Sequence, residues 1–295
     1  MAISQIVYRY MTEQGIIPTL NSCSLRFANV QDLNDTYEFP FISENLRKSE
    51  VNILVHKFRN EGLSSIGKKI FSKCNDNIDS VIDEITNFSR KILEEQYDKT
   101  VEFTKKNHAI CCFSEVINNP AIWGYYAGNS TGAAIGFSSD LAIIEMKKVN
   151  YVDVPPTFHP VYCMGKGYPY VKLLITKSKH WAHEQEQRLI LPKYALVALA
   201  RNEQYKNFLS KDCPEIGFLG DDTEQNKSYE EKHLYMHFHA WNVKEVCFGV
   251  NATDSFKEKT LSILNEEHYS HVNIFQMMAP RSSYDLEKIS INKNN

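Results

Sequence analysis

The sequence Trp181-Ala182-His183-Glu184-Gln185-Glu186-Gln187-Arg188 places two acidic residues and an arginine directly before the apolar run Leu189-Ile190-Leu191. Side chains two residues apart in a strand point to the same face of the sheet. If the strand begins early, Glu184, Glu186 and Arg188 therefore share one face. Two neighbouring carboxylates repel each other, so they need a proton or a cationic partner, and Arg188 can be that partner. A solvated sheet edge with an internal ion pair is the competing interpretation.

Segments rich in β-branched and aromatic residues predict further strands on both sides of this run. They cover residues 6–11, 24–28, 108–114, 133–137, 148–152, 234–241, 243–250, 272–277 and 283–291. The strands at 234–241 and 243–250 are expected to pair with each other. Helices are expected at 170–181 and 255–266, Pro120 can begin a short one, and Gly15 is expected to make a turn.

Residues 43–106 differ in character from the rest of the chain. They lack proline, are rich in Lys, Glu, Asn and Asp, and carry apolar residues at helical spacing. This pattern predicts a helical insertion of two or three helices, which serves as a packed layer, a lid or a partner-binding module. No clean linker divides the chain, so residues 1–295 are predicted to form a single α+β domain that contains this insertion.

Composition narrows the class of protein. The chain has 43% hydrophobic and 23% charged residues and a net charge of −3, which is typical of a folded globular protein and argues against one held to DNA by bulk charge. No signal peptide is recognisable in Met1–Gln5, and no apolar run approaches the roughly 18 residues that span a bilayer. The seven cysteines form no CxxC pair. We therefore expect a cytoplasmic protein with reduced thiols and no membrane contact.

Besides the acidic run, Arg9 and an aromatic and hydroxyl set are candidates for a site. Arg9 on a central strand would be costly to bury without an anion, and its fork suits a phosphate or carboxylate; pairing with a local acid at a sheet edge is the alternative. A second group is the aromatic and hydroxyl set that comprises Phe113, Ser114, Trp123, Tyr126, Ser130 and Thr131. Its flat rings can hold a nucleobase or a nicotinamide. Ordinary core packing is the alternative for each of these aromatic residues.

Metal and nucleotide motifs are weak or missing in the sequence. His237 and His239 point the same way in a strand and could bind one metal together with His233, but no acid or cysteine has matching spacing. No metal site is therefore predicted. The chain has no GxxxxGK[ST] loop, no GxGxxG after a strand, no HExxH and no GxSxG, which argues against the commonest nucleotide, zinc-protease and hydrolase frameworks.

Five short motifs occur in the order found in a widespread prokaryotic domain family of unknown function, which the first two thirds of this chain resemble. The motifs are Tyr8-Arg9-Tyr10, Asn34-Asp35-Thr36-Tyr37-Glu38, Cys112-Phe113-Ser114, Trp123 to Ala127 followed by Gly132 to Phe137, and Trp181 with Glu184, Glu186 and Arg188. Thr36 stands where the family has proline, a departure that affects the turn.

The layout of that family is similar in turn to ADP-ribosyltransferases, which have a basic residue on the first strand, a Ser or Tyr on a middle strand and a late Glu-x-Glu. This resemblance implies a split, mixed or antiparallel β core with NAD as substrate in a central cleft. Glu186 would bind the ribose hydroxyl, Glu184 would orient the acceptor, and Arg9 would hold the pyrophosphate or the nicotinamide ribose. The other cofactor-binding residues would be Ser114 as a hydrogen-bonding group, Trp123 or Tyr126 as the stacking ring, and Tyr10.

The function implied by the resemblance is NAD-dependent ADP-ribosylation of a protein or nucleic-acid acceptor. The resemblance also implies that the protein is a toxin or an anti-phage effector, with an antitoxin or another regulatory partner. One alternative is a non-catalytic ligand- or partner-binding protein in which the Glu–Arg cluster is structural. Another is a metal-dependent nuclease that uses the carboxylates, which would need more acids close together.

Overall fold

The computed structural model describes residues 5–35, 38–39, 41–43, 47–60, 65–75, 77–141, 145–158, 170–193, 195–196 and 234–292. The chain divides into two compact units. The first comprises Met1–Asn34, Lys105–Tyr151 and Lys179–Asn295, and the second comprises Asp35–Thr104 and Val152–Ser178. All the candidate site residues belong to the first unit.

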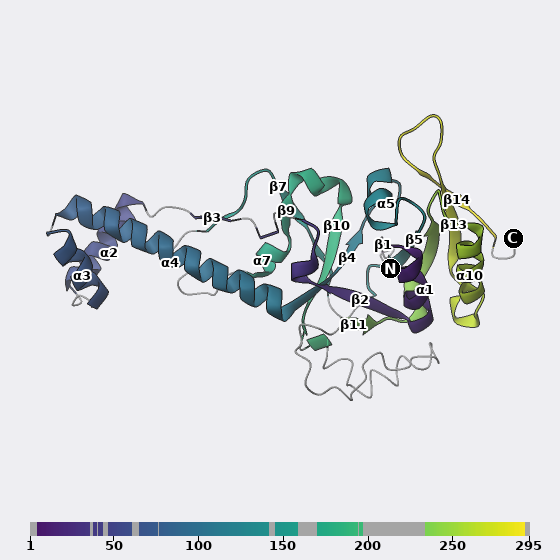
Figure 1. Ribbon diagram of the computed structural model, residues 1–295, viewed down its shortest axis with the longest axis horizontal. Helices are drawn as coiled ribbons and strands as arrows, with labels where there is room; N and C mark the ends of the chain where they lie inside the picture. Colours follow the sequence, from purple (N-terminus) through teal and green to yellow (C-terminus); the bar gives the residue numbers. More distant parts are fainter. Residues whose placement is uncertain are drawn as a thin grey trace. The chain divides into compact units, whose positions relative to one another are not determined.

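The first unit is built around a sheet to which the described residues contribute ten strands (Figure 1). Eight of them follow the order β11-β2-β4-β1-β5-β12-β13-β14, and β10 pairs with β4 and with β6. Within this sheet, β12 and β13 are the only described strands that pair in parallel, and the other pairings are antiparallel. The fold is therefore α+β with a mixed sheet, as the sequence predicted. The strands are β1 (Ile6–Met11), β2 (Ser24–Asn29), β4 (His108–Ser114), β5 (Ala133–Ser138), β6 (Lys147–Lys148), β10 (Glu186–Pro192), β11 (Leu234–His237), β12 (Val243–Phe248), β13 (Asn273–Met278) and β14 (Glu287–Ser290).

Helices cover both faces of this sheet. Apolar side chains of α1 (Glu13–Ser22) and α10 (Asp254–Leu264) share one core cluster with Val7. Side chains of α5 (Pro120–Tyr126) share a second cluster with Tyr8 and Tyr10. Because successive side chains of a strand point to opposite faces, β1 contributes to both cores. Short 3₁₀ turns connect the larger elements of this unit: η1 (Val30–Asp32), η2 (Lys179–Glu184), η3 (Ala240–Asn242) and η4 (Glu267–Tyr269).

Two helix predictions were wrong. Gly15 does not make a turn but lies inside α1, whose ten residues also include Pro18. Both residue types usually interrupt helices, yet packing of Ile16 and Leu20 into the core outweighs that local preference. Residues 170–181 form only the short helix α7 (Tyr170–Leu174), followed by β9 (Thr176–Ser178) and η2.

The expected pairing between the strands at 234–241 and 243–250 was also wrong. The first strand, β11, pairs with β2, whereas β12 pairs with β5 and β13. The turn η3 separates them, and it is fixed by reciprocal bonds between His239 and Asn242. The two strands lie at different places in the sheet because this turn redirects the chain instead of closing a hairpin.

The second unit contains most of the helical segment. Its described helices are α2 (Lys48–Asn60), α3 (Ser65–Lys73), most of α4 (Ile78–Asn107) and the short α7. The described parts of residues 43–106 therefore carry three helices. Their shared core consists of Val51, Val55, Ile70, Phe71, Val81 and Ile85. The strands β3 (Ile42–Ser43) and β8 (Thr157–Phe158) pair in parallel. β7 (Asn150–Val152) begins in the first unit.

The cysteines partly depart from expectation. Cys74, Cys111, Cys112 and Cys247 are free thiols. Cys23, however, is disulfide-bonded, so the prediction that every thiol is reduced is wrong for this residue. Disulfides are uncommon in cytosolic proteins. Within the described parts of the chain, none of the helices combines the length and the apolar character that a bilayer crossing requires.

Candidate functional site

The sheet divides beside β4. Along one edge, β4 pairs with β10 over its whole length, from Ser114 opposite Glu186 to His108 opposite Pro192. Its other edge is shared, because β2 pairs at Ala109 and Ile110 and β1 pairs at Ser114. The stretch between these pairings, centred on Cys112, lies at the junction of β1 and β2. We call it the sheet junction.

Arg9 reaches across this junction from β1. Its Nη1 donates to the backbone oxygen of Cys112 at 2.7 Å, and its Nη2 lies 3.5 Å from the backbone oxygen of Arg26 on β2. The first bond is strong by geometry and the second is weak. Among the described residues no acidic side chain pairs with Arg9, so the pairing with a local acid is not found. A guanidinium has five N–H donors, and this half-buried one keeps capacity for an anion.

Glu186 and Arg188 form a buried ion pair at the start of β10. Nε of Arg188 lies 2.8 Å from Oε1 of Glu186, and Nη2 lies 3.1 Å from Oε2. The side chains are only 7% and 1% exposed for Glu186 and Arg188 respectively. The contact is bidentate, the strongest geometry for this pair of groups. Arg188 is thus the cationic partner that the sequence suggested, and the pair is buried rather than solvated.

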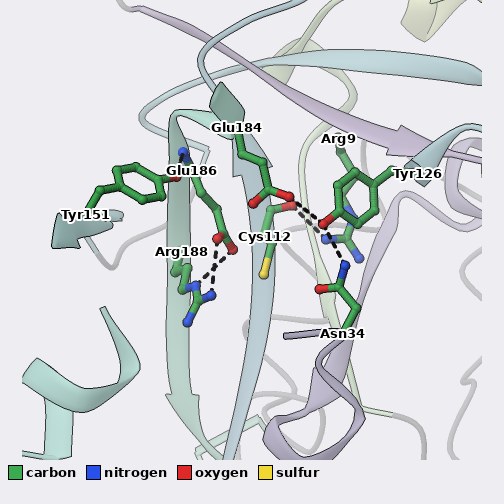
Figure 2. Close-up of polar contacts among 8 residues, drawn as sticks. All are labelled: Arg9, Asn34, Cys112, Tyr126, Tyr151, Glu184, Glu186 and Arg188. Carbon is green, nitrogen blue, oxygen red and sulfur yellow. Dashed lines mark hydrogen bonds and ion pairs between the residues drawn. The ribbon is translucent and has the colours of Figure 1, made fainter. Parts of the chain in front are cut away.

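Glu184 is held differently, because the strand begins only at Glu186. Glu184 ends the turn η2, so the expectation that it shares a strand face with Arg188 was wrong. The hydroxyl of Tyr126 donates to its Oε1 at 2.6 Å, and Nδ2 of Asn34 donates to that hydroxyl at 2.9 Å. Figure 2 shows Tyr126, Asn34 and Arg9 on one side of Cys112 and the Glu186–Arg188 pair on the other, with Glu184 between the two groups.

Gln185, between the two glutamates, has a left-handed backbone with φ of +43°. A residue with a Cβ pays roughly 1 kcal/mol for this conformation, and a β-branched residue more. We expect Gln185→Gly to leave the free energy of unfolding unchanged or raise it by up to about 1 kcal/mol, and Gln185→Val to lower it by more than about 1 kcal/mol. Urea unfolding measures both. Equal stability of the two variants would show that the left-handed turn is not maintained in solution.

Ser114 positions the Glu184 segment. Its hydroxyl donates to the backbone oxygen of Glu184 at 2.6 Å and accepts the N–H of Val116 at 3.1 Å. A hydroxyl has a single proton to donate, and here a backbone carbonyl receives it. Contact between Ser114 and a cofactor stays a prediction, whereas its contact with Glu184 is direct.

The expected aromatic residues differ in placement. Trp123 is fully buried and donates through Nε1 to the backbone oxygen of Ile117 at 2.6 Å. Tyr10 is 8% exposed, donates to the backbone oxygen of Val116, and packs edge-to-face on Trp123 at 5.0 Å. Both rings are therefore residues of one hydrophobic core cluster. Tyr126 alone of these three contacts a candidate acid; burial, and next Glu184, raises the pKa of its phenol.

Sequence reasoning missed two residues of the site, namely Asn34 as a donor to Tyr126, and Tyr151. The phenol oxygen of Tyr151 accepts the backbone N–H of Glu186 at 2.8 Å. Burial raises the pKa of the Cys112 thiol well above its usual value, and Glu186 raises it further against the opposing effect of Arg188 and Arg9. Cys112 therefore stays a neutral thiol, which is a poor nucleophile. The Asn-Asp motif was the one sequence signal that pointed toward Asn34.

The histidine candidates are not assembled into a cluster by the described residues. Nδ1 of His237 lies 3.3 Å from the backbone oxygen of Ser22, and burial lowers the pKa of His237. His233 lies outside the described residues. Within the described ranges, no three His, Cys, Asp or Glu side chains come close enough together to hold a metal ion.

Comparisons of this chain with protein-family models, with curated proteins and with solved structures find no match. The chemistry of the sheet junction therefore has to be inferred from its own geometry. That geometry brings a half-buried arginine and two carboxylates, each with its own partner, to the region around Cys112.

Proposed function

We propose that the chain is an NAD-dependent ADP-ribosyltransferase that uses NAD as a substrate at the sheet junction. The observation that carries the proposal is the convergence of Arg9, Glu184 and Glu186 from distant parts of the sequence. Arg9 binds the carbonyl of Cys112, and the charges of both glutamates act on Tyr126 and on Tyr151. The division of the sheet beside β4 supports the split β core that the resemblance implies.

The reaction breaks the bond between C1′ of the ribose and the nicotinamide nitrogen. The bonding electrons leave with nicotinamide, positive charge develops on the ribose, and an acceptor nucleophile forms the new bond to C1′ and loses its proton. Carboxylates stabilise such an oxocarbenium-like state, and hydrogen bonds to the 2-hydroxyl strengthen in it. Glu186 suits this role, because Arg188 orients its carboxylate and a carboxylate has about four lone-pair sites.

Glu184 is placed to orient the acceptor, and Arg9 is placed to bind the diphosphate or the nicotinamide ribose. Tyr126 donates to Oε1 of Glu184 and so orients the carboxylate, which can position an acceptor and take its proton. The remaining N–H groups of Arg9 can bind phosphate oxygens. Tyr10, Ser114 and Trp123 contribute by donating hydrogen bonds to backbone oxygens of the neighbouring segments, Ser114 to that of Glu184 itself.

Tyr126→Phe is expected to lower transfer to an acceptor about tenfold and to lower NAD hydrolysis much less. The variant removes the hydrogen bond that orients Glu184 but keeps the ring, and one bond to a charged group contributes about 1.5–3 kcal/mol. Parallel assays of labelled acceptor and of released nicotinamide measure the two rates. Equal loss of both rates would contradict the assignment of Glu184 to the acceptor.

The proposal is tested by incubating the purified chain with NAD, with and without cell lysate, and measuring free nicotinamide. We expect release that increases when lysate supplies an acceptor. Expression should also arrest growth if the protein is a toxin or an anti-phage effector, and an antitoxin or another regulatory partner would relieve the arrest. No release of nicotinamide by a folded chain under either condition would refute the activity.

A second candidate is a ligand- or partner-binding protein without catalysis. The observation in its favour is that Glu186 and Arg188 satisfy each other in a bidentate, buried contact, which is also typical of a structural ion pair. Partner binding that is unchanged by Arg9→Met and Glu186→Gln, together with no consumption of NAD, would favour this candidate.

A further inference from the structure

Three aromatic side chains gather beside Glu184 on the surface of the first unit. Tyr125 is 66% exposed, and its ring centroid lies 6.3 Å from that of Trp181. The rings of Trp181 and His183 are nearly parallel, at 27°, with centroids 6.2 Å apart. We call Tyr125, Trp181 and His183 the aromatic cluster. It is built from the two segments that position Glu184, since Tyr126 follows Tyr125 and His183 precedes Glu184.

The aromatic cluster is not part of the hydrophobic core. Trp123, in the same helix as Tyr125, is fully buried, as expected for a ring of the core. Tyr125 instead leaves most of its surface in water, and Trp181 and His183 are half-buried. Large rings that stay exposed side by side often form binding surfaces.

One polar atom of the cluster lacks a hydrogen bond. Nδ1 of His183 lies 3.0 Å from the backbone oxygen of His180, whereas its Nε2 is enclosed and has no hydrogen-bond partner among the described residues. An enclosed ring nitrogen without a partner is uncommon in a folded protein and asks for an explanation. A rotation of this half-buried ring that brings Nε2 to the surface would let a bound ligand with a complementary polar edge provide the partner.

A positive charge lies in the same turn. Lys179 is an exposed residue of η2, at the other end of the turn from His183. The chain as a whole has a net charge of −3, so this is a local feature. Flat rings next to cationic groups match the two parts of a nucleotide, because bases stack on aromatic faces and phosphates pair with cations. Aliphatic residues, which a peptide side chain would favour, are not part of the cluster.

We propose that the aromatic cluster is a subsite that stacks a nucleobase of single-stranded nucleic acid. The consequence for the reaction, that such a strand is the acceptor presented to Glu184, rests on the proposed function. The binding itself does not, because it needs neither NAD nor an intact carboxylate pair.

The test is fluorescence anisotropy of a short labelled single-stranded oligonucleotide, titrated with the full chain at low salt and without NAD. We expect Trp181→Ala and Tyr125→Ala each to weaken binding by about tenfold, since one stacked base contributes roughly 1–3 kcal/mol. Trp181→Phe should retain most of the affinity. Trp241→Ala is the matched control: it removes another ring, 50% exposed and stacked on His239 in η3, and should leave the affinity unchanged.

The outcomes separate this proposal from the proposed function. Oligonucleotide binding that depends on Trp181, in a chain that releases no nicotinamide, would refute the transferase and keep the subsite. Nicotinamide release without any oligonucleotide binding, or equal affinities of wild type and Trp181→Ala at equal melting temperatures, would overturn the subsite. So would displacement of the oligonucleotide by NAD, because the rings would then belong to the cofactor. Selective binding of proteins at these rings would overturn it as well.

Discussion

Replacing Glu186 with Gln is expected to slow nicotinamide release from NAD by about 10²–10³-fold, the range found when a single charge-stabilising group of a transition state is removed. The amide keeps the shape of the side chain and one oxygen acceptor. It loses the negative charge that faces the developing positive charge of the ribose. Release of nicotinamide under single-turnover conditions measures the change without interference from a slow acceptor step.

The ion pair complicates this experiment, and a second variant resolves it. Glu186→Gln leaves the charge of Arg188 buried without the carboxylate of Glu186, so loss of stability contributes to any loss of activity. Combining it with Arg188→Met removes that charge. We expect the double variant to recover most of the stability and none of the activity. Recovery of NAD consumption in the double variant would contradict a catalytic role for Glu186.

Arg188→Met alone is expected to lower the free energy of unfolding by about 3–5 kcal/mol, the usual cost of breaking a buried ion pair from one side. The reason is burial: Arg188 is 1% exposed, and its removal leaves the carboxylate of Glu186 in a poorly hydrated place. Urea unfolding measures the change. Glu186→Leu combined with Arg188→Met should cost less than the sum of the two single changes, because neither charge then remains.

A surface pair provides the matched control for that prediction. Lys259 lies 3.1 Å from Glu13, and the two side chains are 62% and 40% exposed. Lys259→Met should therefore cost at most about 1 kcal/mol. If Arg188→Met costs no more than Lys259→Met, the Glu186–Arg188 pair is not buried in solution.

The strands around the site could be predicted because their signal is local. The bounds predicted for β1 and β4 match the structure at Ile6–Met11 and His108–Ser114. β-branched and aromatic residues cluster in β1, and β4 is a short, largely apolar run without charged residues, which is typical of a buried strand. The position of α1 was missed because Gly15 and Pro18 oppose a helix locally, while the core contacts that outweigh them involve distant strands.

The partners within the site could not be predicted from local patterns. The pair of Glu186 with Arg188 spans two residues, so the strand period suggested it. Tyr126 is 58 residues from Glu184, and Asn34 is 92 residues from Tyr126, so only the folded chain brings them together. Trp123 and Tyr126 share one short helix, and no sequence feature showed that the first faces the core and the second faces an acid.

The most direct test of the central claim uses NAD labelled in its adenine ring, incubated with cell lysate and either the wild-type chain or the Glu186→Gln/Arg188→Met variant at matched melting temperatures. The account predicts that the wild-type chain moves the label onto a macromolecule and that the variant does not. Equal labelling by both proteins, or no labelling by a folded wild-type chain that also releases no nicotinamide, would contradict it.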